Sequence, residues 1–186
     1  MLQMISEKLT AYFDERMDMS EIDRLKMILG FENILHYIVL FGAVFGTAAV
    51  FGVFFEAAFF WLIFGTYRVV AGGLHLSTSL ACTLTTTTII VGGTKLAEMV
   101  RLDDGIIIAG FVVMIGIVIR LAPRRTKNYP VGKEERKKLK IKSIIIVAAF
   151  GMMALILPHG LKEIIAIAAA AETATLLPNM KNYSEI

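Results

Sequence analysis

The chain has 186 residues, 56% of them hydrophobic, and its mean hydropathy is +0.70. A soluble domain of this length cannot bury so much apolar surface, so the composition excludes a soluble globular protein and predicts an all-α polytopic membrane protein with about six transmembrane helices. The net charge of +3 hides an asymmetry, because residues 1–32 carry four Lys or Arg against seven Asp or Glu, whereas residues 120–142 carry ten against two.

The first segment, residues 1–30, is expected to form amphipathic helices on the membrane surface. Apolar residues such as Ile5, Leu9 and Phe13 recur there at helical spacing on a charged background. The segment lacks the basic start, short apolar core and small-residue cleavage site of a signal peptide. We therefore expect the first membrane span to act as the insertion signal.

The spans follow from the length of the apolar stretches. Residues 31–70 are almost continuously apolar over about twice the ~20 residues that one span needs, which predicts two spans joined by a tight turn at 52–56. The other spans are expected at 79–99, 105–121, 141–157 and 161–177. The whole chain, 1–186, is thus expected to be one membrane-embedded domain, made of surface helices at 1–30, spans one to four at 31–121, a basic loop at 122–140 and spans five and six at 141–178.

The basic loop at 122–140 sets the expected orientation. Lys and Arg are retained on the cytoplasmic side of a cell membrane, so this loop is expected to face the cytosol. Counting spans backwards places the connection between spans two and three, and both termini, on the same side. The loop is either a topology signal alone or a patch for anionic lipid headgroups or an acidic peptide. It lacks the interleaved aromatic residues of a nucleic-acid-binding surface, so no nucleic-acid partner is expected.

The residues that carry chemistry gather between spans two and three, at 68–82. The only cysteine, Cys82, comes seven residues after His75. In one straight helix the two side chains would lie about 10 Å apart at ~1.5 Å per residue, whereas an imidazole that activates a thiol must lie roughly 3 Å from it. A catalytic pair therefore requires a bend between these residues.

The local sequence permits that bend. The pair Gly72 and Gly73 allows a positive φ and ends the preceding helix, and a hydroxyl residue at 77–79 can cap the next one. Cys82 would then lie in about the first turn of the new helix, where the helix dipole and a neighbouring imidazolium favour thiolate.

Ordinary structural explanations compete with this interpretation. A single cysteine in a span is commonly a packing residue. The hydroxyl residues Thr78, Thr85 and Thr86 share a helix face with Cys82 and form a polar track. The run Thr85-Thr86-Thr87-Thr88 either lines a site or bonds to carbonyl groups of its own helix.

Two further histidines receive structural roles. A histidine beside a span is costly unless it is used or satisfied, which favours His75 for function. His36, near the start of span one, either contacts the site or bonds a neighbouring helix, and the second role is expected. His159 is expected to be a solvated loop residue. No second cysteine or histidine stands at metal-ligand spacing from the pair, so neither a metal nor a cofactor is expected.

Two charged residues remain open. Arg68 is a topology-setting cation at the end of span two, a clamp for a substrate carboxylate, or a source of electrostatic stabilisation at the reacting centre. Glu172, near the cytoplasmic end of the last span, either orients His75 as a third member of the site or pairs with Arg68 or another helix.

The pattern Arg68, Gly72-Gly73-Leu74-His75 and Cys82, followed by Ala122-Pro123-Arg124-Arg125 and a basic stretch, resembles the accessory gene regulator protein B (AgrB) family. The residues from 172 to 178 look like that family's closing span, although Glu172 stands where the family more often has an amide. The similarity in length and span order extends over essentially the whole chain.

This resemblance implies a membrane cysteine endopeptidase that processes a small precursor, the AgrD peptide, in quorum sensing. In the family's mechanism a thiolate cleaves off the acidic C-terminal tail through a thioester acyl-enzyme, and a Cys or Ser of the precursor then closes a thiolactone or lactone ring. The implied catalytic residues are His75 and Cys82. Assisting residues are expected at Arg68, Gly72, Gly73, Thr78 and Glu172. A precursor peptide, membrane lipid and a second copy of the chain, as a homodimer, are the implied partners.

A different class of function competes with this one. The threonine track, together with Glu56 and Glu172 inside spans, is also compatible with a small multi-span transporter or channel subunit. That function predicts flux in liposomes that survives Cys82→Ala. A pure scaffold protein would tolerate substitution of both His75 and Cys82.

Overall fold

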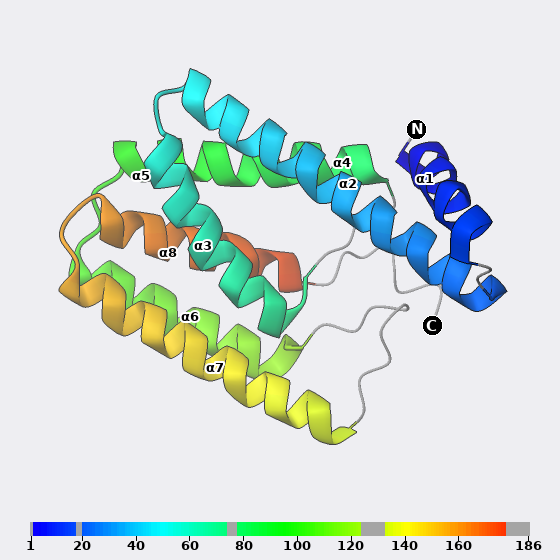
Figure 1. The fold of residues 1–186 in the computed structure, drawn as a ribbon. Coiled ribbons are helices and arrows are strands. Elements are labelled where there is room, and N and C mark those ends of the chain that lie inside the picture. The colour runs from blue at the N-terminus through cyan, green and yellow to red at the C-terminus, as the bar shows by residue number, and fades with distance from the viewer. Residues whose placement is uncertain (1, 18–19, 74–77, 124–132, 178–186) are drawn as a thin grey trace.

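The computed structural model describes residues 2–17, 20–73, 78–123 and 133–177, and all regular structure in these ranges is helical. The prediction of an all-α polytopic membrane protein is confirmed. Figure 1 shows the helices in chain order, which are α1 (Leu2–Met17), α2 (Glu21–Val50), α3 (Phe54–Ala71), α4 (Ser79–Thr87), the π-helical turn η1 (Thr88–Gly92), α5 (Gly93–Met99), α6 (Asp104–Leu121), α7 (Lys133–Ile156) and α8 (Leu161–Leu176).

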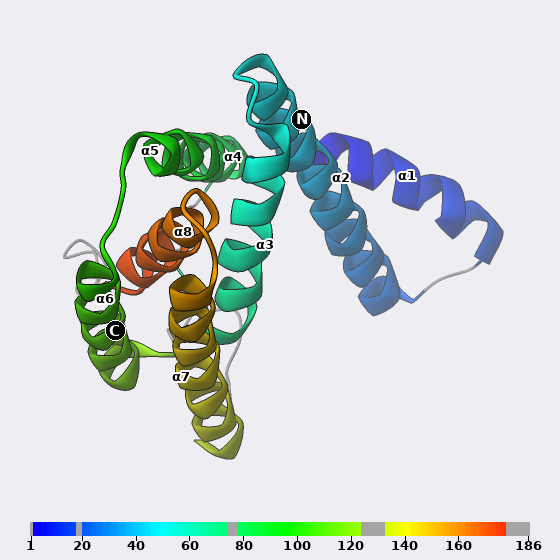
Figure 2. The ribbon, with the colours of Figure 1, turned by 90° about the vertical axis from the view of Figure 1, so that its left-hand side faces the viewer.

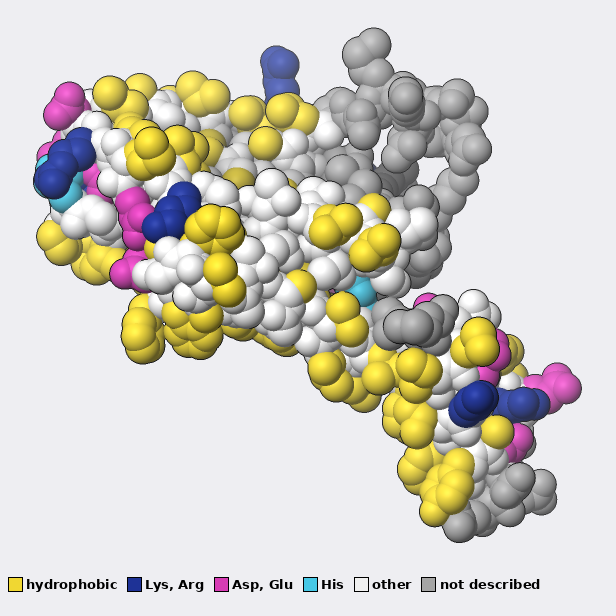
Figure 3. Space-filling view, turned by 90° about the horizontal axis from the view of Figure 1, so that it is seen from above, with side chains coloured by type: hydrophobic (Ala, Val, Ile, Leu, Met, Phe, Trp, Pro, Cys, Tyr) yellow, Lys and Arg dark blue, Asp and Glu magenta, His cyan; other side chains and the backbone are white. Residues whose placement is uncertain are grey.

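Five helices of the described chain are long and apolar enough to cross a membrane. They are α2, α3, the continuous helix Ser79–Met99 formed by α4, η1 and α5, then α6, and α7 from Glu134. In the space-filling view, the middle of the visible face carries mainly hydrophobic and uncharged side chains, and most of its charged side chains lie toward the two ends (Figure 3). This distribution is typical of a protein whose middle contacts lipid.

The sixth expected span is present as helix α8, which lies in the centre of the bundle. Figure 2 shows α8 surrounded by its neighbours, and it packs against α3, α5, α6 and α7. Its 16 residues span about 24 Å, less than the ~30 Å hydrocarbon core of a bilayer. Most of its side chains are buried, so protein rather than lipid surrounds α8.

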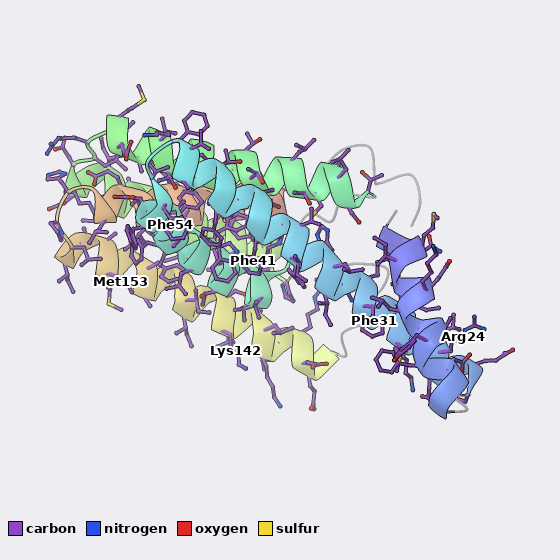
Figure 4. All side chains as sticks on the ribbon, turned by 45° about the horizontal axis from the view of Figure 1, so that its top comes forward. Arg24, Phe31, Phe41, Phe54, Lys142 and Met153 are labelled. Atoms are coloured by element: carbon purple, nitrogen blue, oxygen red, sulfur yellow. The ribbon has the colours of Figure 1, made fainter. Side chains whose placement is uncertain are left out.

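The N-terminal segment differs from the expectation. The surface region was placed at 1–30, but α2 runs without interruption from Glu21 to Val50 and crosses that boundary. Ser20 caps the helix by accepting a hydrogen bond from the Asp23 N–H, and no proline interrupts the sequence that follows. Only α1 is a separate helix. It packs on the first half of α2, near Phe31 (Figure 4). There the ring of Phe13 stacks on that of Phe31, with centroids 5.9 Å apart.

The basic loop is also shorter than expected. It was placed at 122–140, with span five starting at 141, but α7 begins at Lys133. Residues 133–142 are rich in Lys, Glu, Arg and Leu, which favour helix, and the last proline before them is Pro130. Hydropathy locates the apolar part of a helix and not its polar start. Lys142 accordingly lies on the helical part of the basic stretch (Figure 4).

The two ends of the bundle hold different connections. At one end lie the end of α3, the start of α4, the end of α6, the start of α7 and the end of α8 (Figure 1). The basic start of α7 is therefore at the same end as Cys82. The expected tight turn between spans one and two is at residues 51–53, at the opposite end.

Glu163 organises this opposite end. Its side chain is buried and accepts hydrogen bonds from the N–H groups of Leu102, at 3.1 Å, and Gly160, at 2.6 Å. His159 Nδ1 lies 2.8 Å from the same carboxylate, so His159 is a half-exposed partner of Glu163 rather than a purely solvated residue. These bonds join the start of α8 to the chain between α5 and α6.

Adjacent glycines test how closely α5 packs on α3. A Cβ atom at Gly93 would lie 2.7 Å from the ring of the fully buried Phe60, whereas a Cβ at Gly92 would have no contact within 4 Å. Gly93→Ala is therefore expected to lower the free energy of unfolding by about 1–3 kcal/mol through overpacking. Gly92→Ala is the matched control and is expected to be neutral or slightly stabilising, because alanine favours helix. Equal thermal unfolding temperatures of the two variants in detergent would contradict this packing.

Candidate functional site

A break in the chain positions Cys82. Helix α3 ends at Ala71, and Gly72 follows with φ of 69°, a left-handed conformation that suits glycine. Thr78 is extended, and its side chain accepts a hydrogen bond from the Ala81 N–H, so it caps α4. The expected bend is therefore confirmed at both of its described ends. His75 belongs to residues 74–77, which lie outside the described residues.

Cys82 is the fourth residue of α4, and its N–H donates to the Thr78 carbonyl at 3.0 Å. The side chain is half-buried and free of any disulfide. It lines a cavity of about 330 Å³, which we call the Cys82 cavity. Residues of α3, α4, η1 and α8 form its wall, namely Phe64, Arg68, Cys82, Thr85, Thr86, Ile89, Ala171, Ala174 and Thr175.

An ion pair forms one side of this cavity. Arg68 Nη1 lies 3.3 Å from Glu172 Oε2, and the Glu172 side chain is fully buried while 30% of the Arg68 side chain is exposed. The guanidinium also lies over the ring of Phe64, with its Cζ 5.6 Å from the ring centroid. The charge of Arg68 is thus balanced within the protein, and a substrate carboxylate would compete with Glu172 for it.

Gly73 packs directly against the ion pair. A Cβ atom there would lie 2.9 Å from Glu172 Oε1, 3.0 Å from Arg68 Nη1 and 2.8 Å from Thr175 Oγ1. A side chain at this position would force these polar atoms to move apart. Glu172 Oε1 is itself buried without a hydrogen-bond partner in the described part of the chain. The chain between α3 and α4 therefore starts directly beside the Glu172 carboxylate.

A second polar contact joins the same two helices. The hydroxyl groups of Tyr67 and Thr173 are 3.0 Å apart, and both residues are buried. Tyr67 and Thr173 are the immediate neighbours of Arg68 and Glu172 in sequence. Two adjacent polar pairs therefore fix the position of α3 relative to α8, whereas apolar packing alone would allow the helices to slide.

The structure brings together some of the residues proposed from the sequence. Arg68, Cys82 and Glu172 meet at one end of the bundle, and of the alternatives for Glu172 its pairing with Arg68 is observed. Thr85 and Thr86 line the cavity, whereas the hydroxyl of Thr88 donates to the carbonyl of its own helix at Leu84. Both interpretations of the threonine run thus hold, each for different residues.

The structure bears on one ring nitrogen of His36, the residue that was expected to bond a neighbouring helix. Its Nδ1 atom is buried with no hydrogen-bond partner among the residues that the structure describes. Its ring instead lies 6.0 Å, centroid to centroid, from that of the next residue, Tyr37.

Sequence reasoning missed most of the cavity wall. Phe64, Ile89, Ala171 and Ala174 are ordinary residues for an apolar helix, and none of them carries a chemical signal. The one available signal was spacing: Ala171, Ala174 and Thr175 share a face of the last span. Such a face indicates packing as readily as a cavity.

Comparison with known proteins gives matches over nearly the whole chain. The family model described as Accessory gene regulator B matches residues 6–176. The accessory gene regulator protein B of Staphylococcus intermedius is 28% identical over 182 residues, which cover 97% of this chain and 96% of that protein. The protein of the same name from Staphylococcus haemolyticus is 25% identical over 172 residues, which cover 92% of each chain. No solved structure matches the chain.

Substitution of either partner of the ion pair is expected to lower stability, but by unequal amounts. Arg68→Gln leaves the fully buried carboxylate of Glu172 without its cation, and we expect the free energy of unfolding to fall by about 3 kcal/mol. Glu172→Gln keeps an acceptor for a guanidinium that is partly exposed, so a loss of only about 1 kcal/mol is expected. Chemical unfolding in detergent micelles at neutral pH measures both values. A larger loss for Glu172→Gln than for Arg68→Gln would show that the charges are not arranged as described.

Gly73→Ala tests the close approach of the chain to the ion pair. The added methyl group overlaps three polar atoms, and we expect a loss of about 1–3 kcal/mol in stability. Gly46→Ala is the control, since a Cβ atom there meets nothing within 4 Å. If both alanine variants unfold at the same temperature as the unmodified protein, Gly73 is not pressed against the pair.

Proposed function

Because this chain belongs to the accessory gene regulator B family, we propose that it is a membrane-embedded cysteine endopeptidase of agr-type quorum sensing. Its substrate is a small peptide precursor similar to AgrD, from which it removes the C-terminal tail. Its nucleophile is Cys82, and His75 is the general base. The retained part of the precursor leaves as a cyclic thiolactone or lactone.

The cavity beside Cys82 is the observation that carries this proposal. A cysteine that only packs between helices is enclosed by its neighbours, whereas Cys82 is half-buried at the wall of an open space. It lies in the first turn of α4, directly after the cap that Thr78 forms at the break between α3 and α4. His75 follows Gly73 by two residues in the sequence, and Gly73 contacts the same ion pair that borders the cavity. These features supply a nucleophile and a space for the substrate, and the sequence supplies a base close to Gly73.

The first step transfers the peptide to the enzyme. His75 takes the thiol proton, and the sulfur of Cys82 attacks the carbonyl carbon of the bond before the tail. The C–N bond breaks as the imidazolium returns the proton to the leaving nitrogen. The tail departs with a free amine, and the rest of the precursor remains on Cys82 as a thioester.

The second step closes the ring. A Cys or Ser side chain of the precursor loses its proton to His75 and attacks the thioester carbonyl, and the Cys82 sulfur leaves and regains a proton. Hydrolysis by water is the competing reaction. The mainly apolar wall of the Cys82 cavity limits access of water and so favours the internal nucleophile.

Other residues assist without reacting. Arg68, held by Glu172, positions the substrate next to the sulfur, and Gly73 allows the chain to approach that pair. Gly72 provides the turn and Thr78 the helix cap that place Cys82. We further propose that the Cys82 end of the bundle faces the cytosol, that the basic start of α7 attracts the acidic tail of the precursor or anionic lipid, and that the protein acts as a homodimer.

Loss of the nucleophile is the direct test. Protein reconstituted in liposomes is mixed with the peptide encoded by the neighbouring open reading frame, and release of the tail is followed by mass spectrometry. Cys82→Ala and His75→Ala are each expected to abolish release, and a thioester adduct is expected on Cys82 of the unmodified protein. Thr88→Ala is the control, because Thr88 is not among the residues that line the cavity and its hydroxyl bonds its own helix.

Tail release by Cys82→Ala at the rate of the unmodified protein would remove the proposal. Ion or solute flux through the liposomes that survives Cys82→Ala would favour a transporter instead.

A further inference from the structure

The Cys82 cavity is larger and more apolar than attack by a thiol requires. Carbon atoms of Phe64 on α3, Ile89 on η1, and Ala171 and Ala174 on α8 form much of its wall. A nucleophile needs only access to one carbonyl carbon. The remaining space is therefore available to another part of the substrate.

Charge limits what can occupy this space. Arg68 is the one charged residue among the described residues that line the cavity, and its guanidinium is already paired with Glu172 at 3.3 Å. A charged group entering the cavity would lose water without gaining a free partner among the described residues of the wall, which is costly. The cavity therefore favours an uncharged, apolar occupant.

The volume of the cavity limits the size of its occupant. The cavity measures about 330 Å³, near the lower end of the roughly 300–1,000 Å³ of small-molecule sites. A closed cavity of about 150 Å³ holds one benzene molecule. There is thus room for one large side chain and part of its backbone, and not for a folded segment.

Covalent geometry places that side chain. The carbonyl carbon that the sulfur attacks must come within about 3–3.5 Å of it. The side chain of the same residue is attached to the neighbouring Cα atom, so it must occupy space next to the sulfur. The Cys82 cavity is the described space at that position.

We propose that the Cys82 cavity is a specificity pocket for a large apolar side chain on the residue just before the scissile bond, and that Ala171 and Ala174 keep it open. This inference rests on the proposed function of Cys82 as a nucleophile. It adds the class of residue at which the precursor is cut.

The test uses probes that react with a thiol without needing the natural precursor. N-acetyl aminoacyl chloromethyl ketones carry one side chain next to the reactive ketone, and the Cys82 sulfur displaces chloride to form a C–S bond. The glycine, leucine, phenylalanine, aspartate and lysine probes are compared on the full chain in detergent micelles. Intact mass and peptide mapping give the rate of alkylation at Cys82.

The unmodified protein is expected to react with the leucine and phenylalanine probes at least about tenfold faster than with the glycine probe, since even one methylene in an apolar pocket is worth about that factor. Ala171→Leu, and separately Ala174→Leu, fill the pocket and are expected to remove this preference. The glycine probe needs no pocket, so an unchanged rate with it shows that the fold and the thiol are intact.

Ala170→Leu is the matched control. It adds the same side chain one residue away, at an exposed position of α8 that does not line the cavity. The preference for large apolar probes is expected to persist in this variant.

Two results would overturn the pocket alone. One is equal alkylation by all probes, or faster reaction of the charged probes. The other is a preference for large apolar probes that survives in both Ala171→Leu and Ala174→Leu. A third result, no alkylation of Cys82 by any probe, would overturn the nucleophile and the pocket together, which separates failure of the proposed function from failure of this inference.

Discussion

The buried ion pair between Arg68 and Glu172 is the interaction on which the candidate site depends. It joins the last turns of α3 and α8, the two helices that face Cys82 across the cavity, and Gly73 packs directly against it. Removing two charges from water seldom gives a net gain in stability over apolar residues of similar size. We infer that the pair serves mainly to hold a defined geometry, because it specifies one register between helices that apolar contacts would leave free.

Much of the fold could be predicted because composition and hydropathy report directly on a membrane. Spans at 79–99 and 105–121 agree closely with the helices Ser79–Met99 and Asp104–Leu121. The errors have a common cause, which is that hydropathy does not mark polar helix ends. It therefore missed the polar turns of α7 that precede the apolar part of that helix, and it separated a surface segment from α2. Hydropathy also cannot show that α8 is surrounded by other helices.

The candidate site was partly predictable because rare residues in an apolar context attract attention. Arg68, Cys82 and Glu172 were identified in this way, and the glycine pair indicated the break before α4. The meeting of Ala171 and Ala174 with Cys82 depends on how α8 crosses α4, which no local pattern encodes. The catalytic role of His75 stays a prediction, since this residue lies outside the described residues.

The central position of α8 has a consequence for how the protein responds to its membrane. Transmembrane helices that face lipid tilt or deform when the bilayer becomes thicker or thinner. Helix α8 is enclosed by other helices, and hydrogen-bonded or ion-paired carboxylates fix it at both ends, through Glu163 and Glu172. Changes in lipid chain length would therefore act first on outer helices such as α2. A difference between helix length and bilayer thickness would act least on α8, and so least on the part of the cavity wall that α8 forms beside the thiol.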